Sequence, residues 1–438
     1  GLRYKNNSNI LSKQDNKGSY SPNYGDAQLI YQYNISDKFS LSALGNFNIG
    51  QFKLIPQDRE TQFGTLETQL RLRIAYNGQE IDSYRSSGGA ITATFSPKPN
   101  LVIKWINSYF NTDERERFDI EGNYVFDELE TGFNAIGFAP VRINRGLGTY
   151  LNYARNTLNS KNISTEVKAD QNFGNHIFSW GFRLEKNKYK DQINEYHLTD
   201  SAGYILPINS KNFYLDQSIK VQNQIAIDNY TAHIQDSYSL TNNSDLQIGV
   251  RASYNSLSEQ FLISPRLLLA YRPASNNKIF RLIAGVYQQP PSYRSIRAYD
   301  GKLNLNQKAQ RSYHTSAGFD YAFDGLGTRL KFTSEAYFKY TDRLIPYVVD
   351  NVRIKYLSSS LAKAHTYGAD FSIGGEFVKD LVSYFRLSLM SADQDVIGDS
   401  YQRKDKSGNL TTIFPGYLRR PSDQRVNFSI FFQDRLLN

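Results

Sequence analysis

Hydrophobic and polar residues alternate with a period of two over much of the chain, and the stretch 229–255 shows this pattern clearly. Its second half places apolar residues on one face and polar residues on the other: Leu246, Ile248, Val250, Ala252 and Tyr254 against Gln247, Gly249, Arg251, Ser253 and Asn255. This period is typical of a β-strand between two different surroundings. The pattern predicts strands, and it fits a soluble sandwich and a membrane barrel equally well.

The connections between such strands are of two kinds. Seven are short polar turns, near 36–38, 97–100, 173–176, 241–245, 273–278, 324–328 and 378–381. Long polar stretches separate them, near 51–89, 111–150, 189–222, 288–312, 342–365 and 392–422. Outer-membrane barrels have short turns at one rim and long loops at the other, whereas a sandwich has no reason for this asymmetry. We therefore predict an all-β fold, an antiparallel transmembrane β-barrel with about sixteen strands in this chain, more than one sandwich carries.

Composition supports this class and excludes another. Aromatic residues make up 14% of the 438 residues, with 32 Tyr and 27 Phe against 2 Trp. Tyrosines between apolar and wet surroundings are typical of the girdles of membrane barrels. No window approaches the roughly 18 consecutive apolar residues of a spanning helix, so a helical membrane protein is excluded.

Candidate chemistry is sparse. The chain has no Cys, which excludes disulfides and cysteine nucleophiles. The histidines lack metal-ligand spacing and are interpreted as lumen or loop side chains: His176, His197, His233, His314 and His365. The acidic pairs 113–114 and 127–128 are interpreted as solvated loop charges, and no Ser/His/Asp arrangement is found. We predict no enzyme, no cofactor and no metal. The net charge of +9 is not clustered, so nucleic-acid binding has no support.

One residue conflicts with the pattern. If Tyr230, Ala232 and Ile234 face lipid, strict alternation also sends Asp236 there. A charge on the lipid face is unfavourable by up to a few kcal/mol, depending on depth. A β-bulge at 235–236 would turn this carboxylate into the lumen.

Five blocks of sequence, in order, resemble the barrel strands of the TonB-dependent outer-membrane receptors. They are YTAHIQDSYSL with LQIGVRASYN, ISPRLLLAYRPASNNKIFRLIAGVYQQPPSYR, LNQKAQRSYHTSAGFDY, SEAYFKYTDRLI and AHTYGADF. The stretch DERERFDIEGNY is similar to the branch with a carboxypeptidase-regulatory-like domain before the plug. The resemblance covers most of the chain, and it covers the barrel part of the family alone.

The resemblance implies active, TonB-dependent uptake of a scarce nutrient across the outer membrane of a Gram-negative bacterium: a siderophore, a cofactor, a glycan or a peptide. It implies that 1–438 is a barrel fragment with about sixteen of about twenty-two strands. Signal peptide, regulatory-like domain, plug and last strands are expected outside this chain. The implied partners are outer-membrane lipids, the TonB–ExbB–ExbD complex through the missing N-terminal part, and in some members a surface lipoprotein.

Two alternatives stay open: a passive porin, and a surface binding or secretion component anchored by its barrel. For the receptor interpretation, a basic and aromatic stretch is the candidate substrate loop. Its residues are Tyr287, Tyr293, Arg294, Arg297, Tyr299, Lys302 and Lys308. Such a loop would attract an anionic ligand, while the competing interpretation is that these charges are solvated.

Overall fold

The computed structural model describes residues 1–7, 18–65, 68–130, 141–200, 215–274, 277–325, 327–350, 353–378, 381–405 and 408–434. The first strands are β1 Leu2–Asn6, β2 Gly18–Ser36, β3 Phe39–Pro56, β4 Arg59–Gly64, β5 Gln69–Lys98, β6 Leu101–Leu129, β7 Val141–Phe173, β8 His176–Asp200 and β9 Leu215–Thr241. The later ones are β10 Ser244–Asn255, β11 Gln260–Tyr271, β12 Lys278–Gln289, β13 Gln310–Gly325, β14 Thr328–Leu344, β17 Ala362–Val378, β18 Leu381–Val396, β21 Leu418–Arg419 and β22 Val426–Phe431.

These strands form one antiparallel sheet of 18 strands, in which neighbours in sequence are mostly neighbours in space. Strand β3 pairs with β5 beyond the short β4, and β14 pairs with β17. Two hairpins stand apart, β15 Tyr347–Asp350 with β16 Arg353–Tyr356, and β19 Tyr401–Lys404 with β20 Leu410–Ile413. No helix in the described ranges is long and apolar enough to cross a membrane. The predicted all-β antiparallel architecture is confirmed.

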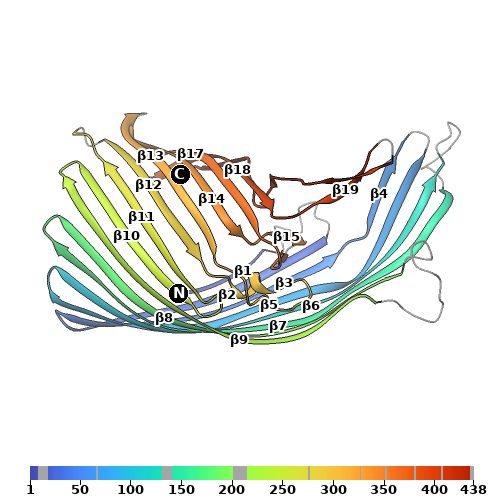
Figure 1. Ribbon diagram of the computed structural model, residues 1–438, viewed down its shortest axis with the longest axis horizontal. Helices are drawn as coiled ribbons and strands as arrows, with labels where there is room; N and C mark the ends of the chain where they lie inside the picture. The colour runs from blue at the N-terminus through green and yellow to red at the C-terminus, as the bar shows by residue number, and fades with distance from the viewer. Residues whose placement is uncertain are drawn as a thin grey trace, which may run out of the picture.

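The sheet curls around a lumen without closing. Strand β1 lies at one edge, on β2, and β22 lies at the other, on β18. Among the described residues, no pairing joins these two edges. Figure 1 shows the curled sheet, with the tips of the long strands at the right of the view.

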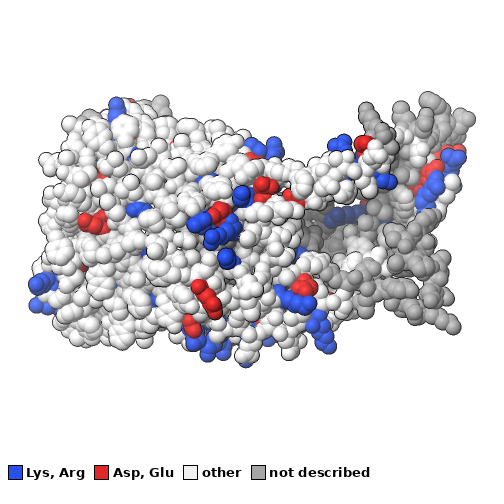
Figure 2. Space-filling view, in the orientation of Figure 1, with Lys and Arg blue, Asp and Glu red and all other residues white. Residues whose placement is uncertain are grey.

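The two faces of the sheet follow the predicted alternation. Register is regular between β10 and both of its neighbours along the stretch that carries Ile248 and Val250. Large apolar side chains on the outward face are exposed, for example Trp105 at 54%, Ile248 at 54% and Phe261 at 66%. A soluble protein rarely exposes so extensive an apolar surface, whereas a barrel wall presents it to lipid. In Figure 2, uncharged atoms dominate the left part of the molecule, where the short turns lie.

The stretches that the sequence suggested as long loops are to a large extent strand. Strand β5 runs over 30 residues and β6 over 29, and β6 includes all of DERERFDIEGNY. Cross-strand pairing continues from Leu101 opposite Gln171 to Leu129 opposite Val141. The loop interpretation was wrong here, because the hydrogen-bonded ladder continues far beyond the length that a membrane requires. The long stretch 51–89 contains a hairpin, since β4 pairs with the first part of β5.

The rims are less asymmetric than the sequence indicated. Strands β10 and β11, which meet at the long-loop rim, are joined by the short turn 256–259. Glu259 has a φ of 51° there, a left-handed conformation that tight turns use. Parts of three predicted short turns, at 275–276, 326 and 379–380, lie outside the described residues.

Asp236 stays on the apolar face. The ladders of β9 with β8 and β10 show no irregularity at 235–236, so the predicted bulge is wrong. The carboxylate instead meets His176, whose Nδ1 lies 2.8 Å from Asp236 Oδ2. His176 stacks on Tyr238 with ring centroids 4.2 Å apart. A polar partner close to the short-turn rim therefore engages Oδ2 of this carboxylate without a change of register, while Oδ1 is buried without a hydrogen-bond partner.

Candidate substrate site

Two segments on the long-loop side fold back into the lumen. One is 290–309, which includes α2 Tyr293–Ile296 and connects β12 to β13; the other is the β15–β16 hairpin, between β14 and β17. We call them the α2 segment and the hairpin. Both contact the inner face of β5–β9, which lies several strands away in the sheet. They therefore reach across the lumen.

Asp191 of β8 holds the α2 segment. Its Oδ2 accepts a hydrogen bond from the Tyr293 hydroxyl at 2.7 Å and lies 3.1 Å from Nη1 of Arg297. Tyr293 and Asp191 are each 3% exposed. The Tyr293 ring stacks on Tyr189, with centroids 4.7 Å apart. Burial, with the Asp191 carboxylate, raises the pKa of Tyr293, so its hydroxyl remains a donor at neutral pH.

Apolar contacts complete this docking. Ile296 is fully buried and packs in a cluster with Leu158 of β7. The Gly301 carbonyl accepts a hydrogen bond of 2.9 Å from the Asn223 amide on β9. Gly301 has a φ of 81°, and an added Cβ would lie 3.1 Å from Ile193, so the wall approaches here closely enough to favour glycine.

Arg353 holds the hairpin. Its guanidinium lies 2.9 Å from a carboxylate oxygen of Glu80 on β5 and 2.8 Å from one of Glu116 on β6. It also lies over the Phe118 ring, 4.0 Å from the centroid. Burial by itself lowers the pKa of Arg353, but the two glutamates outweigh it, so this pKa is raised.

A third carboxylate, Asp82, lies beside this pair. Burial is the main reason that its pKa rises to about 7, and the charges of Glu80 and Glu116 add to the effect, while Arg353 opposes it. A spanning strand needs about 9–11 residues, so Asp82 lies outside the membrane part of β5. Oxygens of the three acids lie within 4.8 Å of one another, a spacing that a divalent cation accepts, but Arg353 already supplies the positive charge.

A cavity of about 740 Å³ lies beside the start of the α2 segment, against the inner face of β8–β14. Arg251 and Arg266 line it from the wall, and Arg420 and residues 290–292 also contribute. The rings of Tyr287 and His314 stack, with centroids 4.4 Å apart. The Arg266 guanidinium lies over the Tyr287 ring in a cation–π contact, 5.3 Å from its centroid. The cavity therefore combines aromatic surface with several positive charges.

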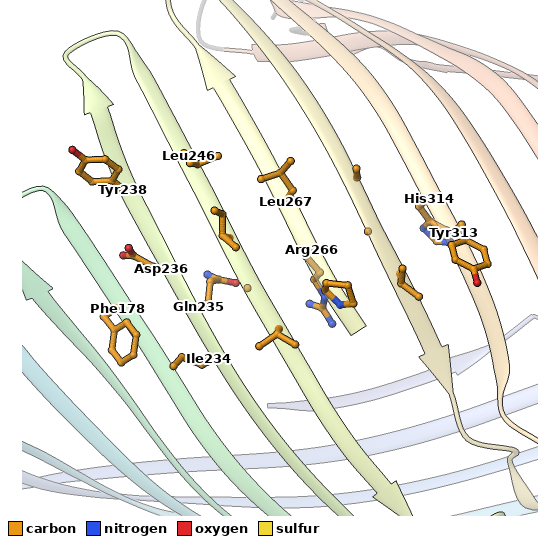
Figure 3. Close-up of a pocket in the computed structure, with 17 residues that line it drawn as sticks. Phe178, Ile234, Gln235, Asp236, Tyr238, Leu246, Arg266, Leu267, Tyr313 and His314 are labelled. Atoms are coloured by element: carbon orange, nitrogen blue, oxygen red, sulfur yellow. The ribbon is translucent and has the colours of Figure 1, made fainter. Parts of the chain in front are cut away.

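A larger hollow, of about 910 Å³, lies over β8–β13. Most of its lining comes from the apolar face, including Phe178, Leu246 and Leu267 (Figure 3). Asp236 lies at its margin (Figure 3). Because this face meets lipid, we do not assign a nutrient to it.

The sequence-predicted substrate residues have different surroundings. Tyr287 lines the cavity, whereas Tyr293 and Arg297 are engaged by Asp191. The rest are more exposed: Arg294 paired with Glu114, Tyr299 under Lys355, Lys302 paired with Asp300, and Lys308. Asp191 and Arg353 were not predicted from the sequence, because each occurs in an ordinary alternating or polar stretch without a local signal.

The exposed apolar outer face, the polar inner face and the segments that cross the lumen are those of the wall of a transmembrane β-barrel. The chain belongs to the TonB-dependent receptor family: the family described as "TonB dependent receptor-like, beta-barrel" matches residues 1–412. Members of this family are transporters that interact with TonB and with their substrates.

Solved structures with a similar fold include several transporters. The outer membrane transporter YddB from Escherichia coli is 12% identical, with a TM-score of 0.45, over 90% of this chain and 59% of that one. The RagAB peptide transporter is 10% identical, with a TM-score of 0.46, over 91% and 54%. A mutant of the ferric enterobactin receptor PfeA from Pseudomonas aeruginosa is 10% identical, with a TM-score of 0.42, over 95% and 64%.

The chain thus spans between 54% and 64% of the length of these three proteins. No curated protein matches the sequence.

Proposed function

We propose that this chain is the barrel of a receptor that takes up a scarce nutrient across the outer membrane of a Gram-negative bacterium, with energy delivered through TonB. The observation that carries this proposal is the pair of segments clamped across the lumen, in a chain of this family. A passive porin needs an open aqueous path, and the Asp191 and Arg353 contacts hold protein across that path. The porin alternative is therefore less well supported.

We infer further that the nutrient carries negative charge. The cavity offers Arg251, Arg266 and Arg420 beside the ring of Tyr287. Guanidinium groups bind carboxylate and phosphate oxygens in pairs of hydrogen bonds, and rings of this kind add apolar contact.

The exposed members of the candidate loop serve as the first contact in this proposal. Arg294, Tyr299, Lys302 and Lys308 are exposed and belong to the segment that connects β12 to β13. Positive charge at an entrance raises the rate at which an anionic ligand arrives, and added salt weakens the effect. Tyr293 and Arg297 instead hold the segment in place.

The partners proposed for the complete receptor are the TonB–ExbB–ExbD complex and outer-membrane lipids. A surface lipoprotein is a further proposed partner, as the resemblance to the family implies for some members. Co-purification of the complete receptor from its own membrane tests for that lipoprotein, and recovery of the receptor alone would contradict it.

The test is uptake by cells that carry the complete receptor, with and without TonB. Uptake that disappears without TonB supports the proposal. Uptake that persists favours a porin, and binding without uptake favours a surface binding component. For the anionic ligand, we expect R251Q/R266Q to reduce binding more than R294Q/K302Q, which leaves the cavity intact; equal binding by both variants and wild type would refute the inference.

A further inference from the structure

The outward face of β8 changes character along its length. Phe178, Trp180, Phe182 and Leu184 come first after the short turn, and they are followed on the same face by the exposed residues 186, 188 and 190, all lysines. A spanning strand needs about 9–11 residues, so the membrane part that starts at the short turn ends near these lysines. They therefore lie at the level of lipid headgroups on the long-loop side.

Neighbouring strands continue this feature. Exposed basic residues occupy the same face of β5–β8 beyond the apolar band, and we call them the basic belt: Arg85, Arg115, Arg117, Lys161, Lys186, Lys188 and Lys190. Carboxylates share this face as well, among them Asp113, Asp119 and Asp228, and Asp119 pairs with Arg155. Asp228 lies 3.3 Å from the Lys186 ammonium group. The belt therefore carries a clear excess of positive charge.

The register of the sheet brings like charges together within the belt. Lys161 of β7 lies directly opposite Lys188 of β8. Their other cross-strand neighbours, Asn111 and Ala226, are not acidic. Like charges directly opposite each other destabilise a sheet. An arrangement of this kind is favourable when an anion from outside the chain lies between the two ammonium groups.

The position of the belt identifies that anion. The belt borders the lipid-facing band without a break on β7 and β8. Counted from the short turn that joins these strands, Ile163 comes before Lys161 on β7, and Leu184 comes before Lys186 on β8. On β10 and β11 the corresponding outward residues are Tyr254 and Phe261, which are apolar or aromatic. The belt is thus confined to the wall of long strands and adjoins the membrane surface there.

We propose that the basic belt binds the phosphate groups of lipid headgroups in the outer leaflet, with Lys161 and Lys188 at its centre. Lysines near a membrane surface that carries negative charge each contribute about 1 kcal/mol, or about fivefold in affinity. Their long side chains can extend from the apolar band to the headgroups. The proposal rests on a barrel that spans the outer membrane, and it is independent of the nutrient.

The experiment measures binding of phosphorylated lipid A to the complete receptor in detergent, with dephosphorylated lipid A and inorganic phosphate as separate probes. Removing two charges in K161Q/K188Q is expected to weaken binding of phosphorylated lipid A roughly 30-fold. The matched variant K38Q/K98Q removes two lysines at the short-turn rim and is expected to bind like wild type. Added salt is expected to weaken wild-type binding.

Equal affinity of K161Q/K188Q and wild type would overturn the proposal. So would equal binding of lipid A with and without phosphate, which would indicate apolar contact alone, or full competition by inorganic phosphate, which would indicate a site for the free anion. The substitutions relieve repulsion, so we expect a folded barrel, and K188Q/K190Q provides a second variant with the same expected loss. The assay contains no nutrient, so its result is separate from that of the uptake test.

Discussion

Replacing Asp191 with asparagine is expected to release the α2 segment from the wall. The substitution removes the charge that Tyr293 and Arg297 share while keeping the size of the side chain. Hydrogen bonds to a charged group contribute about 1.5–3 kcal/mol each. The Arg297 side chain is 30% exposed, so water compensates in part for its loss. We therefore expect docking to weaken by about 3 kcal/mol, roughly 150-fold in the docking equilibrium.

Hydrogen–deuterium exchange of the backbone amides in 296–304 measures this equilibrium in the complete receptor. Exchange in D191N is expected to rise by roughly two orders of magnitude. Tyr293→Phe removes one hydrogen bond and keeps the stack on Tyr189, so about a tenfold rise is expected. Asp300→Asn is the matched control, because it removes an exposed carboxylate of the same segment whose partner is Lys302.

The pH dependence gives an independent check. The pKa of Tyr293 is raised above its ordinary value of 10.0 in the docked state. A raised pKa means that this contribution to docking is fully present below pH 10 and is lost as the pH rises through the raised value. Protection of the segment is therefore expected to be constant from pH 7 to pH 9. Equal exchange in D191N and D300N, or loss of protection by pH 9, would refute the reasoning.

Three further outcomes are expected. Arg353→Met leaves the buried Glu80 and the half-buried Glu116 without their cation and is expected to weaken hairpin docking by about 3 kcal/mol, seen as faster exchange across 347–356; unchanged exchange would contradict the clamp. Because the pKa of Asp82 is raised to about 7, its contribution to stability is present below about pH 4 and is lost between pH 4 and 7. Asp82→Asn should therefore gain thermal stability relative to wild type as the pH rises from 5 to 8, and parallel pH profiles would disprove the assignment. His176→Leu leaves Asp236 unpaired on the lipid face and is expected to cost about 1 kcal/mol in barrel stability, while H176L/D236L recovers it; additive losses would show that the pair is not coupled.

Much of the wall was predictable from sequence because a strand fixes the relation between neighbouring side chains. Residues two apart share a face whatever lies on either side, so the alternation of 244–255 predicted the apolar face that the structure confirms. By the same alternation, Leu330 lies on the outward face of β14, which it shares with Phe338. Leu330 is nevertheless 3% exposed. A Cβ added at Gly375 would lie 2.8 Å from the Leu330 side chain, and one added at Gly325 would lie 3.3 Å from it. These two glycines carry no side chain, and Leu330 fills the space that this leaves.

The clamps across the lumen were decided by tertiary structure. Tyr293 and Asp191 are 102 residues apart, and Arg353 and Glu80 are 273 apart. Such contacts depend on how far the sheet curls and on how long the strands continue beyond the membrane, and neither is encoded in a local period. Sequence thus determined which side chains point inward, through geometry that repeats every two residues. The curvature of the sheet determined which of them meet, because it sets the distance across the lumen.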